Sequence, residues 1–192
     1  MKPIFAVLLF LCLTSFPAFA ESKTADFAMG CFWCAEHDFE KLKGVESVVS
    51  GYEGGTKETA TYEQVSSGNT GHFETVRVTY DPAKIQYKEL LNVFWDNVDP
   101  FDAAGQFCDK GKQYSAVIFA ANEDERKTAQ ESLDALQSRH KDKKVTVQVL
   151  KASEFYPAED YHQDYAENNK IRYNMYRQGC GRDQRLEAIN GN

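Results

Sequence analysis

The chain lacks the features that suit a membrane or a nucleic acid. Beyond residue 20 it has no apolar stretch long enough to cross a bilayer. Lysine and arginine total 22 against 29 aspartates and glutamates, for a net charge of −7 at pH 7. Without a basic patch, an acidic surface disfavours nucleic acid and anionic membranes as partners. Internal repeats, low-complexity segments and linkers are also missing, so we expect a single domain.

The first twenty residues carry almost no charge, with Lys2 as the only charged side chain. An apolar run from Ile4 to Leu13 precedes Ala18-Phe19-Ala20, which fits the small-x-small rule for signal-peptidase cleavage. We therefore predict a signal peptide over 1–20, cleavage after Ala20, and a catalytic domain over 21–192 that is periplasmic or otherwise exported. An uncleaved anchor is the alternative, but the run is short for a bilayer. A lipoprotein through Cys12 is disfavoured because Leu11 is not small.

Cysteine is scarce, with five in the chain. Cys12 would leave with the signal peptide, and the remaining four are Cys31, Cys34, Cys108 and Cys180. Four cysteines in an exported chain allow two disulfides with three pairings. A purely structural pair of bridges is disfavoured, because a domain of this size rarely needs them and residues three apart bridge poorly.

The pattern of apolar and polar residues predicts alternating strands and helices. Strands are expected at 26–29, 45–52, 72–80, 114–121 and 145–150. Helices are expected from residues 30–31 to 42, and at 86–97, 123–139 and 159–168. We expect irregular structure at 62–71, at 99–111 and in the tail past residue 179. This order predicts an α/β or α+β domain.

The segment Gly30-Cys31-Phe32-Trp33-Cys34 places two thiols three residues apart, on one face of a helix. In the first helical turn, free N–H groups and the helix dipole would stabilise a Cys31 thiolate, which makes Cys31 the candidate nucleophile. Cys34 could resolve a sulfenic acid formed on Cys31, or be a small buried side chain. Phe32 and Trp33 could form a pocket wall or belong to the core.

Glu74 lies in a β-alternating stretch that follows Gly71-His72-Phe73. The alternation leaves open whether its side chain meets solvent or the interior. Buried beside a thiol, the carboxyl would have a raised pKa and could donate a proton. Tyr62 and Tyr114 could supply neutral hydroxyl donors, although a lone tyrosine is more often a core residue.

Several segments together resemble the A-type peptide methionine sulfoxide reductases. They occur in the family's order and span most of the chain after residue 20. They are GCFWC at 30–34, YEQVSSGNTGHFE at 62–74, VRVTYDP at 76–82, DKGKQY at 109–114 and AEDYHQDY at 158–165.

The resemblance implies reduction of methionine S-sulfoxide, free or in proteins, and hence repair of oxidised proteins. It implies a single α/β domain of two layers, with a central mixed β-sheet flanked by helices. It also implies no metal or organic cofactor and an external, thioredoxin-like dithiol as reductant. We expect a monomer.

The resemblance also assigns roles. Cys31 would attack the sulfoxide sulfur, and Glu74 would act as general acid toward its oxygen. The remaining site residues would be Tyr62 and Tyr114 as hydrogen-bond donors, Phe32 and Trp33 around the substrate methyl group, and Asp109 and His162 on the substrate main chain.

The chain departs from the family pattern at Cys34, where many members have glycine. Some relatives with cysteine there use it for recycling, so Cys34 is the first candidate resolving thiol. Cys180 could be a second resolver, a relay to the reductant, or a structural partner of Cys108.

Two other classes of function remain open at this stage. The Cys31/Cys34 pair also suits a thiol–disulfide oxidoreductase. A metal-binding module could use the four cysteines and one histidine, although the spacing is poor for zinc. The candidate histidines are His37, His72, His140 and His162.

Overall fold

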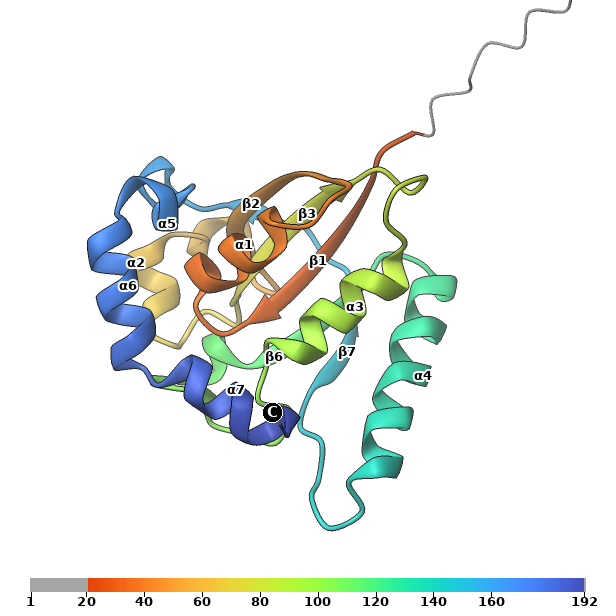
Figure 1. Cartoon of the computed structure of the whole chain (residues 1–192). Helices are drawn as coiled ribbons and strands as arrows, with labels where there is room; N and C mark the ends of the chain where they lie inside the picture. Colours follow the sequence, from red (N-terminus) through yellow and green to blue (C-terminus); the bar gives the residue numbers. More distant parts are fainter. Residues whose placement is uncertain (1–20, 192) are drawn as a thin grey trace, which may run out of the picture.

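A six-stranded sheet of order β7-β6-β1-β3-β2-β8 forms the centre of the computed structural model, which describes residues 21–191 (Figure 1). The predicted signal peptide and its cleavage site after Ala20 lie outside the described residues. β6 and β7 pair in parallel and all other neighbours pair antiparallel. The strands are β1 (Lys23–Met29), β2 (Val45–Glu53), β3 (Phe73–Tyr80), β6 (Ala116–Ala120), β7 (Gln148–Lys151) and β8 (Tyr156–Pro157).

Helices cover one face of this sheet. They are α1 (Phe32–Glu40), α3 (Tyr87–Asp96) and α4 (Glu123–Arg139). Strand alternation sends Phe27 and Met29 of β1 into the core beneath them, while Ala28 packs on the opposite face with Val117 and Phe119. The two-layer α/β fold with a mixed sheet is therefore confirmed.

The C-terminal part corrects the sequence predictions. The tail past residue 179 is not irregular, because α6 (Lys170–Gly179) is followed by α7 (Arg182–Asn190). Gly181, with φ +64°, makes the turn between them. The helix predicted at 159–168 is a 3₁₀ turn, η3 (Asp160–His162), and α5 (Tyr165–Asn168), separated by left-handed Asp164.

Smaller corrections concern segments that surround the later site. The stretch 62–71 contains α2 (Tyr62–Ser66), and 99–111 contains a hairpin of β4 (Gly105–Gln106) and β5 (Asp109–Lys110). The strand predicted from residue 114 begins two residues later, because the 3₁₀ turn η2 (Lys112–Tyr114) precedes it.

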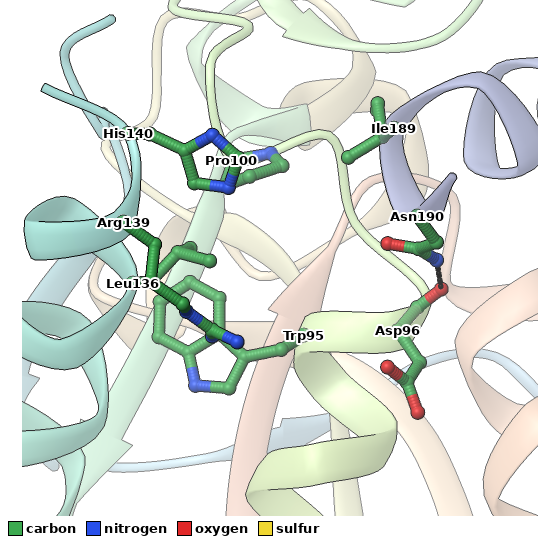
Figure 2. A pocket seen from close by; sticks show the side chains of 8 residues that line it. All are labelled: Trp95, Asp96, Pro100, Leu136, Arg139, His140, Ile189 and Asn190. Carbon is green, nitrogen blue, oxygen red and sulfur yellow. Dashed lines mark hydrogen bonds between the residues drawn. The ribbon is translucent and has the colours of Figure 1, made fainter.

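A cleft of about 640 Å³ lies between α3, α4 and α7 (Figure 2). Asn190 closes one side by donating to the Asp96 carbonyl over 3.2 Å. The lining of this cleft includes no cysteine and shares no residue with the pocket around Cys31 described below. Among residues 21–191, no helix combines the length and apolar character needed to cross a bilayer.

Candidate active site

Cys31 lies at the N-cap of α1, where β1 turns into the helix. Gly30 makes this turn with φ +80°, and a Cβ there would lie 2.6 Å from Gln106 Cβ, so the position requires glycine. The Cys31 carbonyl accepts the Cys34 N–H over 3.1 Å. Cys31 is 6% exposed and Cys34 1%, and both are free thiols.

Above Cys31 lies a small pocket of about 70 Å³. A pocket of this size admits a group of a few heavy atoms. Seven of its eight lining residues are predicted site residues. The lining consists of Cys31, Phe32, Trp33, Tyr62, Glu74, Asp109, Tyr114 and Tyr176.

Glu74 settles the question that the strand pattern left open, because its side chain is buried, with 2% exposed. Its Oε2 accepts the Phe32 N–H over 3.0 Å, which fixes the carboxyl beside the start of α1. Burial raises the pKa of Glu74 to about 8, although the Phe32 hydrogen bond opposes the rise. At neutral pH most Glu74 carboxyls are therefore protonated and able to donate.

The two thiols have opposite electrostatic surroundings. Burial raises the pKa of Cys31, and Cys34, Glu74 and Asp109 add to the rise. The helix N-terminus was expected to lower the pKa of Cys31, but burial and these neighbouring groups raise it instead. A hydrogen bond from Cys31 lowers the pKa of Cys34, against the effect of burial. The pKa of Cys31 thus lies above that of Cys34, which falls to about 7, so Cys34 is the thiol of the pair that ionises first.

Tyr62 and Tyr114 both line the pocket, as predicted. The Tyr62 N–H donates to Glu159 Oε1 over 2.9 Å, and Tyr52 donates its hydroxyl to the other carboxylate oxygen over 2.8 Å. Burial raises the pKa of Tyr62 and of Tyr114, so both hydroxyls remain protonated donors.

The aromatic wall is fixed from behind. Trp33 stacks on Tyr165 with ring centroids 3.7 Å apart, and its Nε1–H donates to His162 Nδ1 over 3.0 Å. His162 is buried, and its Nε2 has no hydrogen-bond partner among the described residues. His162 thus holds Trp33 in place, and its predicted contact with the substrate main chain stays a prediction.

Tyr176 is a pocket residue that the sequence reasoning missed. Its hydroxyl donates to Asp109 Oδ2 over 2.5 Å and also contacts Cys31. Burial raises the pKa of Asp109 as well. The spacing of Tyr173, Tyr176 and Cys180 is that of one helix face, a signal that could have identified α6.

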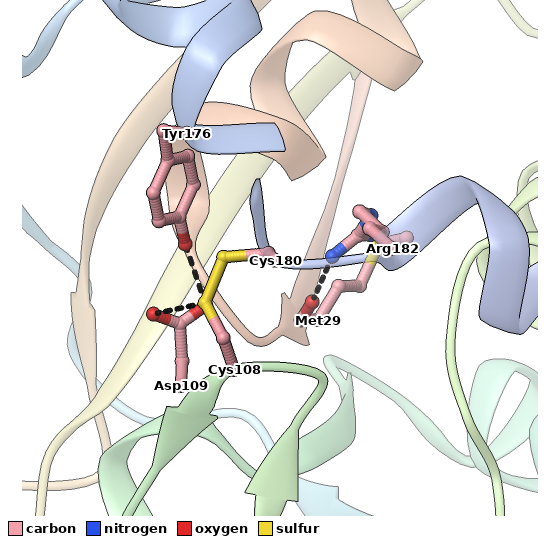
Figure 3. The surroundings of a disulfide bond; sticks show 6 residues. All are labelled: Met29, Cys108, Asp109, Tyr176, Cys180 and Arg182. Carbon is pink, nitrogen blue, oxygen red and sulfur yellow. Dashed lines mark hydrogen bonds between the residues drawn. A yellow bond between two sulfur atoms is a disulfide. The ribbon is translucent and has the colours of Figure 1, made fainter. Parts of the chain in front are cut away.

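Cys108 and Cys180 form a disulfide that ties the β4–β5 hairpin to the end of α6 (Figure 3). Figure 3 shows Asp109 and Tyr176 meeting beside this bridge. Within residues 21–191, the cluster close enough to share an ion is Cys108, Asp109 and Cys180, and two of these are already bonded to each other. The structure does not bring the four cysteines together as one metal site.

Next to the pocket lies a wider groove of about 440 Å³ that shares Trp33, Tyr62 and Tyr176 with it. Tyr161, His162, Tyr165 and Arg172 complete the lining. The small pocket therefore opens toward a surface large enough for the chain that flanks a bound side chain.

Comparison with known proteins agrees with the geometry. The model of the family "Peptide methionine sulfoxide reductase" matches residues 23–192. Peptide methionine sulfoxide reductase MsrA 2 of Caulobacter vibrioides is 47% identical over 190 residues, 98% of this chain and 96% of that protein. MsrA of Listeria innocua is 47% identical over 165 residues, 85% and 93% of the two chains.

Solved structures show the same arrangement. Methionine sulfoxide reductase A of Corynebacterium diphtheriae superposes with a TM-score of 0.74 at 31% identity, covering 78% of this chain and 76% of that one. Mxr1 of Saccharomyces cerevisiae in reduced form gives 0.73 at 29%, covering 78% and 86%. With a family model that matches almost the whole described chain, and with the predicted residues gathered in one pocket, this protein belongs to the peptide methionine sulfoxide reductase family.

Proposed function

We propose that this chain reduces the S epimer of methionine sulfoxide, free or in oxidised proteins, with Cys31 as nucleophile and Glu74 as general acid. The observation that carries these roles is a buried, mainly protonated carboxyl beside a thiol in a pocket of about 70 Å³. The pocket matches a methyl sulfoxide group, which is small and apolar on one side and has a basic oxygen on the other.

In the first step the Cys31 sulfur attacks the sulfoxide sulfur. The oxygen leaves poorly as an anion, so Glu74 donates a proton to it while Tyr62 and Tyr114 donate hydrogen bonds. Phe32 and Trp33 hold the methyl group, and Asp109 and His162 contact the substrate main chain. The Cys31 proton passes to the Glu74 carboxylate and restores the acid. The products are the thioether and a Cys31 sulfenic acid, and the substrate has gained two electrons from Cys31.

In the second step Cys34 attacks the Cys31 sulfenic acid. A sulfur–sulfur bond forms, the sulfur–oxygen bond breaks, and the oxygen leaves as water. Cys34 is favoured over Cys180 because it is a free thiol hydrogen-bonded to Cys31, whereas Cys180 is bonded to Cys108. Cys34 is therefore the resolving residue, and Cys108–Cys180 is a separate bridge.

An external dithiol then reduces the Cys31–Cys34 disulfide by thiol–disulfide exchange. A thioredoxin-like protein is the reductant that fits this chemistry, and for the yeast protein Mxr1 a complex with Trx2 has been solved. The signal-peptide pattern of residues 1–20 supports export, which requires that the reductant be supplied outside the cytoplasm.

The test is a single turnover without reductant. Enzyme with the Cys108–Cys180 bridge intact is mixed with excess racemic methionine sulfoxide. We expect one methionine per enzyme from the S epimer only, and a Cys31–Cys34 disulfide in the peptide map. Absence of methionine release from either epimer would overturn the proposed activity, and a bridge between Cys31 and Cys180 would overturn the role of Cys34.

The same protein tests the rival thiol–disulfide oxidoreductase. Both thiols of the pair are buried beside a pocket that suits a methyl sulfoxide group, so a small substrate reaches Cys31 more readily than a protein disulfide does. We expect turnover of methionine sulfoxide to exceed exchange with a model protein disulfide by orders of magnitude, and the opposite ranking would favour the rival.

A further inference from the structure

A buried charge cluster lies near enough to Cys34 to act on its charge. Asp38 follows Cys34 by one turn on the same face of α1, and its carboxylate is buried. The two cations that meet this carboxylate come from the other end of the chain, Arg177 from α6 and Arg182 from α7. Three helices therefore converge on the resolving thiol.

Arg177 makes the tighter contact with Asp38. Its Nη1 donates to both carboxylate oxygens, over 3.1 and 3.2 Å, and to the Tyr173 hydroxyl over 3.0 Å. Its Nε donates to Asp183 over 2.9 Å, but the Asp183 side chain is 56% exposed and so is screened by water.

Arg182 is the more unusual residue, because its side chain is 2% exposed. Its guanidinium donates to two neutral carbonyls, Met29 O over 3.3 Å and Asn97 O over 2.7 Å, and lies 4.5 Å from the Phe107 ring centroid. The nearest carboxylate is Asp38 at 3.8 Å, which Arg177 already occupies. Two cations thus share one buried anion, and a positive excess remains in a region of low dielectric.

This excess acts on one thiol of the pair. Both arginines favour the charged form of Cys34 and Asp38 opposes it, whereas Cys31 meets the acids Glu74 and Asp109. The titratable and charged groups around Cys34 are Cys31 at the N-cap of α1, His37 and Asp38 of α1, Glu74 of β3, Tyr165 of α5, Tyr173, Tyr176 and Arg177 of α6, and Arg182 of α7.

We propose that Arg177 and Arg182 are positioning residues that hold Cys34 as a thiolate, ready to attack the Cys31 sulfenic acid. This rests on the proposed function, in which Cys34 resolves. The thiolate supplies the electron pair of the new sulfur–sulfur bond, and the departing hydroxide takes up a proton and leaves as water. Without the arginines the first step proceeds but the second is slow, because Cys34 must first lose its proton.

The direct test titrates Cys34 alone. In a Cys31→Ser background with the Cys108–Cys180 bridge intact, Cys34 is the one titrating thiol of residues 21–191, and its thiolate is followed by ultraviolet absorbance. We expect Arg177→Met and Arg182→Met each to raise the Cys34 pKa by roughly one unit. Arg182→Lys, which keeps the charge, should restore most of the shift.

Arg185→Met is the matched control, because Arg185 lies on α7 but pairs with Asp99, away from Cys34. It should leave the Cys34 pKa unchanged. An unchanged Cys34 pKa in folded Arg177→Met would overturn the proposal, as would an unchanged Cys34 pKa in Arg182→Met where that variant folds.

Single turnover with Cys31 present separates the two steps. The arginine variants should release methionine at the wild-type rate, form the Cys31–Cys34 disulfide roughly tenfold more slowly at neutral pH, and accumulate a sulfenic acid that a cyclic diketone traps. Raising the pH should restore disulfide formation. Equal rates of disulfide formation in variants and wild type refute the proposal, whereas loss of methionine release in the wild type refutes the proposed function instead.

Discussion

The protonation of Glu74 makes a quantitative prediction about pH. With a pKa of about 8, roughly nine in ten Glu74 carboxyls are protonated at pH 7 and roughly one in ten at pH 9. If the carboxyl donates its proton to the sulfoxide oxygen, the rate of methionine release should show a falling limb with a midpoint near 8. The cause is burial, which disfavours the carboxylate more than the Phe32 hydrogen bond favours it.

Glu74→Gln tests this assignment directly. Glutamine has nearly the same shape and can donate a hydrogen bond, but it cannot transfer a proton at these pH values. General acid catalysis contributes about 10²- to 10⁴-fold, so we expect methionine release in a single turnover to slow by about that factor. The falling limb near pH 8 should also disappear.

The assay is rapid-quench measurement of methionine from the S epimer between pH 6 and 10, with circular dichroism to check the fold. Tyr114→Phe is a useful comparison, since it removes a hydrogen bond at the same oxygen but leaves the acid, and should retain the falling limb at a lower rate. An unchanged single-turnover rate in Glu74→Gln, or a falling limb that persists in it, would remove Glu74 from the role of acid.

Three further predictions follow from the same pocket and its surroundings. Cys31→Ser should abolish methionine release, because a hydroxyl oxygen is a much weaker nucleophile than the cysteine sulfur, and measurable turnover by mass spectrometry would contradict the nucleophile assignment. Replacing Cys108 and Cys180 by alanine removes a cross-link with a sequence separation of 72, and the chain entropy of such a loop corresponds to about 4 kcal/mol of stability. Urea unfolding should therefore show that the free energy of unfolding falls by about this amount. A fall below about 1 kcal/mol would contradict a stabilising role for the bridge. Tyr176→Phe removes the hydrogen bond to Asp109 and should raise KM for a peptide sulfoxide several-fold with a smaller effect on kcat, so an unchanged KM would contradict a role for this contact in holding Asp109.

The parts of the molecule that could be predicted from the sequence are those that local residue patterns determine. Runs of β-branched residues marked strands such as β3. α4 begins and ends at the predicted residues, because Asn122 caps its N-terminus and the charged residues that follow favour an exposed helix. The pocket residues between 30 and 114 were also found. They belong to short sequence segments, such as the two aromatics beside paired thiols, which can be recognised without knowing how the chain packs.

Features that depend on packing between distant segments could not be predicted from the sequence. Glu74 lies in β3, where residues on both faces are buried, so alternation carries no information about its orientation. The polar sequence of α7 has no clear apolar period, and its most buried side chain is an arginine satisfied by carbonyls from Met29 and Asn97. The bridge between Cys108 and Cys180 was one of the alternatives left open for Cys180, and no spacing rule could select it.

The corner between α6 and α7 explains why the second disulfide matters to a site that does not contain it. Cys180 stands between Arg177 and Arg182, and its partner Cys108 precedes Asp109. The bridge therefore fixes the backbone that supplies Tyr176 and Asp109 near Cys31 as well as the cations near Cys34. With the roles proposed above, we expect the reductant to open the Cys31–Cys34 disulfide in every cycle and to spare Cys108–Cys180. Selective reduction by a dithiol protein, with the bridge retained in the peptide map after many turnovers, is the expected outcome, and equal reduction of both disulfides during sustained activity would show that the corner holds without its bridge.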